Sequence, residues 1–421
     1  MRVEGSISPP GDKSITHRAL ILAALSRTRV ELAGVLTAHD AKSMARVLRQ
    51  LGVGVGPLRR GQGVEVCGRA WRRPKGTLNC GNSGTTVRLV LGCLAGHRFE
   101  TRLTGDASLR HRPMRRVTEP LVEMGAEVKG EGEDGLPISI CGGSLTPYRY
   151  ESPVASAQLK SALLLAGLTG GVAVTVREPA RSRDHTERLF RYLGLDIHVE
   201  GNEIEFRGPG DWPITEPYEL RVPGDASSAA FLVAAAILAD EGELEITNVG
   251  VNPTRTGYLQ VLERMGVNIR RENETEICGE PVADIRVGPT ELFGTEVEAD
   301  EIPGLIDEIP MLAGLASQAA GETVFRSVGE LRVKESNRLA LIADNLRAVG
   351  ATASVEGDDL YIMGSDARLR GWVETARDHR LAMAFTVLGT AEGAEIELSE
   401  TGSAGVSYPG FLEDLRMVTG G

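Results

Sequence analysis

Several features that mark whole classes of protein are scarce or missing in this chain of 421 residues. Aromatic residues make up only 4% of it, and no apolar run approaches the ~18 residues of a membrane-spanning helix. The N-terminus lacks a signal-type apolar core, so we expect a cytoplasmic protein. Acidic residues outnumber basic ones by 58 to 46, giving a net charge of −12. Nucleic acid or an acidic membrane would need a basic stripe, so neither partner is expected.

Cysteine and metal-binding patterns are also poorly represented. The five cysteines are odd in number and form no CxxC pair, which argues against a disulfide framework and against a zinc knuckle. No Ser-His-Asp order, no metal-spaced set of histidine and glutamate, and no nucleophilic cysteine motif stands out. We therefore expect neither a bound metal nor covalent catalysis.

The chain does contain an internal repeat of about 70 residues. A turn of small or polar residues, followed by a helix rich in alanine and leucine, occurs six times. An amphipathic helix that ends in glycine alternates with this apolar helix, and short alternating runs predict strands between them. The starts of the six apolar helices are marked by Ser14, Ser83, Ser156, Ser227, Asp307 and Arg380.

These repeats predict an unusual α/β arrangement. Helices that are apolar on nearly all sides should lie inside, which places the sheets outside. Six such repeats are too many for one core, so we expect two domains of three repeats each. Residues 208–217 are the most turn-rich stretch between the third and fourth repeats, and we place a domain crossing just after them. Buried helices whose N-termini face the gap between the domains would form a cleft suited to polyanions.

The first candidate anion site is the stretch PGDKSITHR, residues 10–18, which runs directly into the first apolar helix. Lys13 and Arg18 lie at the positive end of this helix, where unpaired backbone N–H groups can face an oxyanion. Each cation can add a charge-assisted hydrogen bond worth about 1.5 to 3 kcal/mol. Taken alone, such a stretch is more often a capped surface helix whose cations are solvated.

Two further helix starts and one loop carry residues suited to anionic or hydroxylated ligands. Residues 81–86 resemble a phosphate loop without the Gly-Lys-Ser/Thr of an ATPase, and Arg88 follows within a turn. The basic run 109–116 could be a solvated loop, although Arg112 precedes a proline and is held extended. Residues 152–158 begin a buried helix with hydroxyl and amide side chains, and an ordinary N-cap is the alternative interpretation.

Carboxylates occur among cations in the C-terminal half. We expect Asp307 and Glu308 in the opening turns of an apolar helix. On a second helix starting near Glu335, Lys334 would lie at the N-terminus and Arg338 one turn further on. A carboxylate among lysines and arginines stays ionised more readily and can act as a base, while a second can return the proton.

Taken together, these motifs resemble those of the 5-enolpyruvylshikimate 3-phosphate synthase family. Ten motifs stand in the family's order from end to end: PGDKSITHRA, GNSGTTVRL, DASLRHRPM, SPVASAQLKSALL, SRDHTE, PGDASSAA, LIDEIP, LRVKESNR, RDHRLAM and SYPGF. The resemblance implies an α/β (α+β) fold, a two-domain inside-out α/β barrel in which each domain has three βαβαββ repeats with buried helices and outer sheets. It implies a first domain of residues 1–10 plus 223–421, a second of residues 11–222, and an active site in the cleft between them.

The resemblance also implies the reaction. The enolpyruvyl group of phosphoenolpyruvate would be transferred by addition and elimination to the 5-hydroxyl of shikimate 3-phosphate, releasing phosphate. This step belongs to the shikimate pathway, which leads to chorismate and the aromatic amino acids, and it needs no metal and no organic cofactor. We expect a monomer, and Gly84 leaves room for a phosphoenolpyruvate mimic, which favours sensitivity to glyphosate.

By the same resemblance, particular residues receive roles. Asp307 would take the proton of the 5-hydroxyl, Glu335 would exchange a proton with the methylene carbon, and Lys13 would lie between both substrates. Shikimate 3-phosphate would be held by Lys13, Ser14, Arg18, Ser156, Ala157 through its backbone, Gln158, Ser182, Asp307 and Lys334. Phosphoenolpyruvate would be held by Lys13, Gly84, Arg112, Gln158, Arg338 and Arg380. The expected substrate-binding set also includes Asn82, Arg88 and His379.

Two positions depart from the family pattern, and two other functions remain as alternatives. Val406 stands where many members have a lysine, and His185 where many have a tyrosine. A sister family transfers enolpyruvyl to UDP-N-acetylglucosamine, but it typically has Lys-Asn in place of Lys13-Ser14 and carries a reactive loop cysteine. A non-enzymatic repeat protein would not need basic side chains at helix starts in an acidic chain.

Overall fold

A computed structural model describes residues 1–132, 134–210, 212 and 214–420, which fall into two compact units. Unit 1 comprises Met1–Pro10, Pro223–Glu276 and Pro281–Gly421, and unit 2 comprises Gly11–Val222 and Ile277–Glu280. Each unit has a hydrophobic core of its own. Residues 211 and 213 of the expected turn-rich stretch lie outside the described residues.

Unit 2 consists of three copies of one four-stranded sheet, ordered β14-β3-β5-β4, β6-β7-β9-β8 and β10-β11-β13-β12. In every copy the first two strands run parallel and the other two pairings are antiparallel. Strand β14, from the end of the unit, pairs with β3 near its beginning and so completes the first sheet. The strands are β3 (Arg29–Ala33), β4 (Gly54–Val55), β5 (Val64–Cys67), β6 (Leu78–Asn79), β7 (Glu100–Thr104), β8 (Glu127–Gly130), β9 (Ile138–Cys141), β10 (Tyr148–Glu151), β11 (Val174–Arg177), β12 (Ile197–Glu200), β13 (Glu203–Phe206) and β14 (Tyr218–Arg221).

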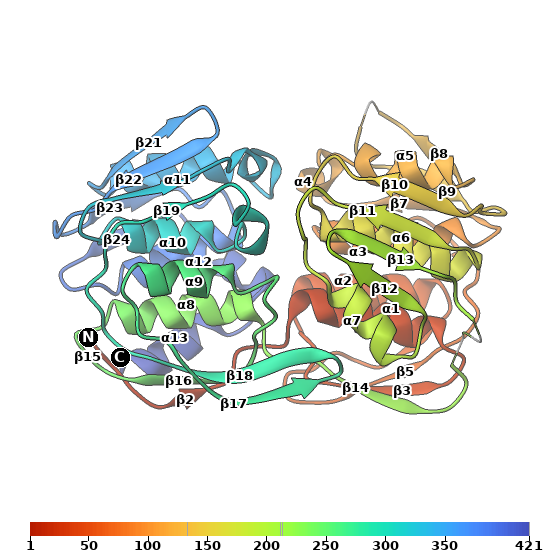
Figure 1. The fold of residues 1–421 in the computed structure, drawn as a ribbon, viewed down its shortest axis with the longest axis horizontal. Helices are drawn as coiled ribbons and strands as arrows, with labels where there is room; N and C mark the ends of the chain where they lie inside the picture. The colour runs from red at the N-terminus through yellow and green to blue at the C-terminus, as the bar shows by residue number, and fades with distance from the viewer. Residues whose placement is uncertain (133, 211, 213, 421) are drawn as a thin grey trace. The chain divides into compact units, whose positions relative to one another are not determined.

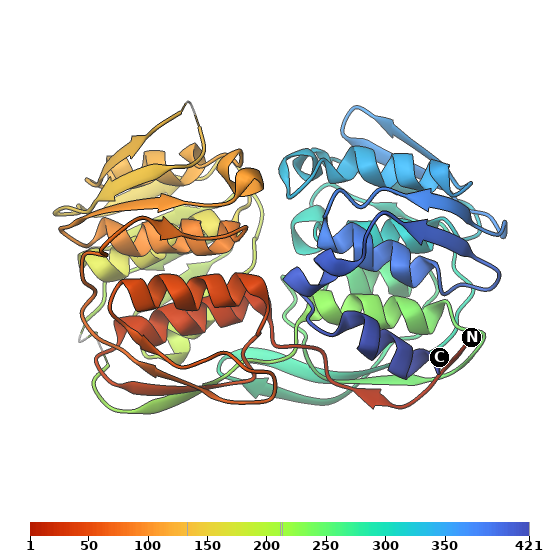
Figure 2. The same cartoon turned by 180° about the vertical axis from the view of Figure 1, so that it is seen from behind.

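The helices of unit 2 alternate between buried and amphipathic, and Figure 2 shows α1 and α2 running side by side. The apolar helices begin behind side-chain caps, Asp12, Ser83 and Ser156, each of which accepts a bond from a backbone N–H three residues on. Helices α3 and α6 approach closely at Gly92, where an added Cβ would lie 2.2 Å from the carbonyl oxygen of Ala162. The helices are α1 (Lys13–Leu25), α2 (His39–Gln50), α3 (Gly84–Ala95), α4 (Ala107–Arg110), α5 (Arg115–Glu123), α6 (Ala157–Gly170) and α7 (His185–Tyr192).

Unit 1 also contains three repeats of strands and helices, but the sheet of its last repeat is shorter. Its sheets are β17-β18-β16-β2, β19-β20-β22-β21, β23-β24 and β1-β15. The sixth repeat ends with its second helix, so its sheet has two strands and the expected βαβαββ pattern is incomplete there. The strands are β1 (Arg2–Val3), β2 (Ser6–Ile7), β15 (Glu241–Gly242), β16 (Leu244–Gly250), β17 (Arg270–Ile277), β18 (Glu280–Val287), β19 (Glu296–Val297), β20 (Glu322–Phe325), β21 (Thr352–Glu356), β22 (Asp359–Met363), β23 (Arg370–Val373) and β24 (Glu395–Leu398).

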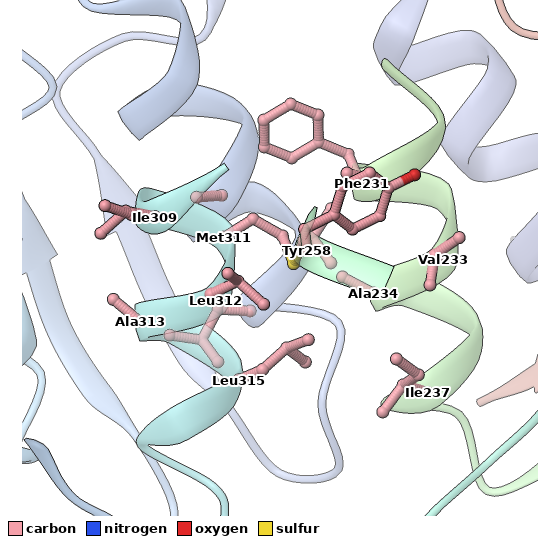
Figure 3. Packing of buried hydrophobic residues seen from close by; sticks show 14 of the residues in the cluster. Phe231, Val233, Ala234, Ile237, Tyr258, Ile309, Met311, Leu312, Ala313 and Leu315 are labelled. Atoms are coloured by element: carbon pink, nitrogen blue, oxygen red, sulfur yellow. The ribbon is translucent and has the colours of Figure 1, made fainter. Parts of the chain in front are cut away.

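The apolar helices α8, α10 and α12 lie in the interior of unit 1, and Figure 1 shows them between the strands at its two ends. All of α8 is buried, and Figure 3 shows Leu315 of α10 and Ile237 of α8 pointing toward one another. The predicted α/β (α+β) fold of buried helices and outer sheets is confirmed, and the sheets of the described residues do not close into a barrel. The helices are α8 (Ala226–Ile237), α9 (Gly257–Arg264), η1 (Ile302–Gly304), α10 (Ile309–Ala316), η2 (Gly329–Val333), α11 (Arg338–Ala348), α12 (His379–Leu388), η3 (Gly402–Val406) and α13 (Phe411–Thr419).

Two helices begin later than expected. Helix α10 begins at Ile309, so Asp307 precedes it and Glu308 is its N-cap residue, because Pro310 fits the first turn of a helix. Helix α11 begins at Arg338 instead of near Glu335, because the Asn337 side chain accepts a bond from a backbone N–H and caps the helix. None of the helices in the described residues is both long and apolar enough to cross a membrane.

Candidate functional site

The start of α1 holds Lys13 against a buried carboxylate. Lys13 is the first residue of the helix, and its ammonium forms an ion pair with Asp40 of α2. The side chain of Asp40 is 6% exposed, whereas that of Lys13 is 22% exposed, so the cation retains an open side. Asp40 was missed in the sequence because an acidic residue in the first turn of an amphipathic helix is ordinary there.

Arg18 is buried more deeply than the sequence indicates. Its guanidinium donates to the Thr186 hydroxyl at 2.7 Å, the Ser161 hydroxyl at 2.6 Å and the Ser14 carbonyl at 2.9 Å. Burial lowers the pKa of Arg18 to about 10. These bonds tie α1 to α6 and α7 and fix the backbone at Ser14.

The starts of α3 and α6 share a network of cations and amides. Arg88 donates to the Gln158 side-chain oxygen at 2.6 Å, and the Gln158 amide donates to a threonine hydroxyl of α3 at 3.1 Å. Arg112 donates to the Asn82 side-chain oxygen at 2.8 Å. A Cβ on Gly84 would lie 3.2 Å from a guanidinium nitrogen of both Arg88 and Arg112, so glycine leaves space between the two cations.

Two serines of unit 2 are held by one buried carboxylate, Glu178. Its Oε1 accepts from the Ser156 backbone N–H at 3.1 Å and from the Ser182 hydroxyl at 2.6 Å. Its Oε2 accepts from the Lys160 ammonium at 2.8 Å, and Lys160 also contacts Glu187 at 2.7 Å. Glu178 and Lys160 were missed because their pairing depends on the tertiary fold.

His17 connects the starts of α1 and α3 from a fully buried position. Its Nδ1–H donates to the Lys13 carbonyl at 2.7 Å, and Nε2 lies 3.4 Å from the Ser83 hydroxyl. Burial lowers the pKa of His17 to about 4, although Asp40 opposes this shift. The imidazole therefore stays neutral in the folded protein at neutral pH.

The low pKa of His17 predicts acid lability. The unfolded histidine binds its proton near pH 6.5 and the folded one near pH 4, so stability is full above pH 6.5 and falls between these values. From pH 7 to pH 5 the loss from this group is about 2 kcal/mol. His17→Asn keeps a donor for the Lys13 carbonyl and should flatten this slope in urea unfolding, whereas exposed His198→Asn should not. An unchanged slope in His17→Asn would contradict the prediction.

In unit 1, Asp307 faces three cations. Its carboxylate oxygens lie 4.0 Å from the Lys334 ammonium, 3.6 Å from Arg338 and 3.8 Å from Arg380. Burial lowers the pKa of Lys334, an effect that Asp307 opposes. The side chain of Asp307 is 14% exposed and that of Lys334 is 25% exposed, so these two have more room for an exchangeable partner than Arg338 and Arg380.

Arg338 is oriented by a carboxylate on each side. Asp378 accepts two of its N–H bonds, at 2.8 and 3.1 Å, and Glu335 contacts it at 2.6 Å. Burial lowers the pKa of Arg338, but Asp378 and Glu335 outweigh it and the pKa is raised. The pKa of Asp378 is lowered, because Arg338 outweighs the opposing effect of burial. In the sequence, Asp378 stands in the motif RDHRLAM, two residues before the helix marker Arg380.

The structure thus gathers the predicted residues into two groups, one in each unit. Among the departures from the family pattern, His185 is buried and its Nδ1 lies 2.7 Å from Glu280, while Val406 lies in η3. His379 and Ala157 are the first residues of α12 and α6. Within the described chain, no group of three or more His, Cys, Asp or Glu side chains is arranged to hold a metal ion.

This chain is similar to known enzymes along almost its whole length. A family model described as EPSP synthase (3-phosphoshikimate 1-carboxyvinyltransferase) matches residues 1–415. A 3-phosphoshikimate 1-carboxyvinyltransferase of Desulfitobacterium hafniense is 46% identical over 416 residues, covering 98% of this chain and 94% of the relative. An enzyme of the same name from Synechococcus elongatus is 44% identical over 425 residues, covering 99% of this chain and 94% of the relative.

Solved structures agree with this similarity. An EPSP synthase from Acinetobacter baumannii superposes with a TM-score of 0.86 at 37% identity, covering 99% of this chain and 95% of that one. The enolpyruvyl transferase NikO from Streptomyces tendae shares the fold, with a TM-score of 0.78 at 19% identity and coverage of 99% and 95%. The predicted family and its transferase activity are confirmed. The chain belongs to the EPSP synthase (3-phosphoshikimate 1-carboxyvinyltransferase) family of enzymes.

Proposed function

We propose that the two groups of residues act together on one pair of substrates, phosphoenolpyruvate and shikimate 3-phosphate. The observation that carries this proposal is Asp307, a carboxylate within 4.0 Å of three cations from two other segments of unit 1. A base that is surrounded by anion-binding groups suits a reaction in which a hydroxyl attacks a phosphorylated, carboxylated molecule.

The groups of unit 2 supply the contacts for the shikimate phosphate and ring. Lys13, Ser14 and Arg18 lie in the first turns of α1, with Ser156, Ala157, Gln158 and Ser182 at the start of α6 and just before α7. The start of a helix carries unpaired N–H groups and a positive dipole end, both of which favour a phosphate. Lys334 and Asp307 of unit 1 complete this set, and Lys13 also reaches phosphoenolpyruvate.

Phosphoenolpyruvate is held by cations from both groups. Gly84 leaves space between Arg88 and Arg112, and Asn82, Gln158, Arg338, His379 and Arg380 complete the set with Lys13. Arginine suits the carboxylate and the phosphate of phosphoenolpyruvate, because its planar guanidinium binds two oxygens at once. Asp378 accepts two N–H bonds from Arg338 and fixes its orientation before the substrate arrives.

The transfer then proceeds by addition and elimination. The 5-hydroxyl oxygen bonds to C2 of phosphoenolpyruvate while its proton passes to Asp307, and Glu335 delivers a proton to the methylene carbon. In the resulting tetrahedral intermediate the bond from C2 to the phosphate oxygen breaks. Phosphate leaves and takes up the proton that Asp307 holds, and Glu335 takes a proton back from the methyl carbon to restore the double bond. Fixed cations stabilise the negative charge throughout.

Replacing Asp307 tests this function. In Asp307→Asn we expect phosphate release that depends on shikimate 3-phosphate to fall by about 10² to 10⁴-fold, because the general base is lost. Exposed Asp344→Asn is the control and should retain full activity, since its side chain is 61% exposed. Release with UDP-N-acetylglucosamine alone, or unchanged release in Asp307→Asn, would contradict the proposal.

We further propose that the enzyme works as a monomer in the cytoplasm. The five cysteines are free thiols, which suits a reducing compartment. A single species of about 45 kDa in light scattering would support the monomer, whereas a mass of twice that value would contradict it.

A further inference from the structure

A buried polar cluster behind Arg380 has no role in the reaction described above. It comprises Ser227 near the start of α8, Arg255 just before α9, and Glu308 at the start of α10. All three are buried: Glu308 is 1% exposed, Arg255 3% and Ser227 5%. Buried charge is costly unless it is paired, so the cluster requires an explanation.

The two arginines of this region meet at one serine and one carboxylate. Arg255 donates to the Ser227 hydroxyl at 2.5 Å, and Arg380 donates to the same oxygen at 3.4 Å. The Ser227 hydroxyl donates to Oε1 of Glu308, which also lies 3.4 Å from Arg380 and 3.9 Å from Arg255. Two guanidinium groups this close repel each other, and both lie within 4 Å of the Glu308 carboxylate.

Arg380 is therefore placed between two carboxylates. On one side is Glu308, and on the other is Asp307, whose Oδ2 lies 3.8 Å away and whose carbonyl accepts a bond at 2.8 Å. Arg255 is anchored separately by Asp225 at 3.8 Å. If Glu308 lost its charge, Arg255 would push Arg380 away and Arg380 would move toward Asp307.

We infer that Glu308 is a positioning residue that sets the place of Arg380 for phosphoenolpyruvate. The inference rests on the proposed role of Arg380 in binding that substrate. Glu308 itself contacts no substrate in this scheme. It is linked to Arg380 directly and through the Ser227 hydroxyl, which accepts a bond from Arg380 and donates one to Glu308. The effect should fall mainly on phosphoenolpyruvate, because most of the residues proposed to hold shikimate 3-phosphate lie in unit 2 and only Lys334 and Asp307 of that set lie in unit 1.

The structure allows an unusually conservative test. Oε1 of Glu308 makes the polar contacts, whereas its Oε2 has no hydrogen-bond partner among the described residues. In Glu308→Gln the amide oxygen can keep the bond from Ser227 and the amide nitrogen takes the unpartnered place. The substitution thus removes the charge and leaves the shape and the serine bond.

The experiment compares Michaelis constants for the two substrates in phosphate-release assays. In Glu308→Gln we expect KM for phosphoenolpyruvate to rise about tenfold, as when one charge-assisted contact is misplaced, with KM for shikimate 3-phosphate within twofold of wild type. Ser227→Ala should raise the same constant, and exposed Glu322→Gln should change neither. Thermal unfolding of each variant shows whether a change in KM is caused by a folding defect.

The outcomes separate the inference from the proposed function. A wild-type protein without phosphate release that depends on shikimate 3-phosphate would overturn the proposed function itself. An active wild type with unchanged constants in Glu308→Gln, or with both constants raised equally, would overturn only the inference. If the glutamine variant does not fold, direct binding of phosphoenolpyruvate to Ser227→Ala decides: weakened binding supports the inference, and wild-type binding overturns it.

Discussion

Asp378→Asn is expected to lower kcat/KM by about 10² to 10³-fold, which corresponds to about 3 to 4 kcal/mol. Asp378 accepts two N–H bonds from Arg338, at 2.8 and 3.1 Å, and a bond from the Arg380 backbone at 2.9 Å. In asparagine an N–H₂ group would replace one of the two carboxylate oxygens, and it would face N–H donors from which it cannot accept a bond. Two cations proposed to bind phosphoenolpyruvate would be displaced together, in a site where Arg338 is 1% exposed.

The control for this prediction is Asp358→Asn. Asp358 also pairs with an arginine, Arg332, but its side chain is 65% exposed, and exposed ion pairs contribute little. We expect wild-type kinetics in this variant. Asp378→Asn should also unfold at a lower urea concentration, because breaking a buried ion pair costs about 3 to 5 kcal/mol. Unchanged kinetics and stability in Asp378→Asn would show that Arg338 is held in place by other groups.

The helices and their order could be predicted from the sequence because their signals are local. Asp12, Ser83 and Ser156 each precede an apolar run, and each caps a buried helix in the structure. Boundaries were less certain where two signals competed. Pro310 fixes the start of α10 after Asp307, and the cap at Asn337 delays α11 beyond Glu335.

The candidate substrate-binding residues could be named from sequence motifs, but most of the carboxylates that hold these residues in place could not. Asp40 and Glu178 each act on a residue of another element, and nothing in the surrounding sequence distinguishes them from surface acids. Glu308 could be placed at the start of an apolar helix, but its contact with Arg380 could not be predicted. Asp378 is the exception, because an aspartate at a helix start next to Arg380 already indicates a cap. Which cation each carboxylate meets is decided by the tertiary fold.

Replacing Lys160 is expected to cause a large loss of stability, because its ammonium lies between two buried carboxylates. It contacts Glu178 at 2.8 Å and Glu187 at 2.7 Å, and all three side chains are no more than 2% exposed. Burial lowers the pKa of Lys160, but Glu187 and Glu178 outweigh it and the pKa is raised. The lysine therefore stays charged in the folded protein.

In Lys160→Met we expect a loss of about 3 to 5 kcal/mol in the free energy of unfolding at pH 8, because two buried carboxylates lose their shared cation. One of them should then take up a proton in the folded state. The folded variant would bind more protons than the unfolded chain, so its stability should rise as pH falls, narrowing the difference from wild type by pH 5. Urea unfolding at both pH values measures this, and exposed Lys129→Met should match wild type throughout.

A second substitution separates charge from packing in this cluster. Oε2 of Glu187 has no hydrogen-bond partner in the described chain, so Glu187→Gln can be accommodated without a lost bond there. The double variant Lys160→Met/Glu187→Gln should recover part of the stability at pH 8, since it removes one of the two uncompensated charges. It should still bind shikimate 3-phosphate weakly, because Glu178 would no longer be held against Ser156 and Ser182. A double variant no more stable than Lys160→Met would assign the loss to packing of the lysine stem and not to charge.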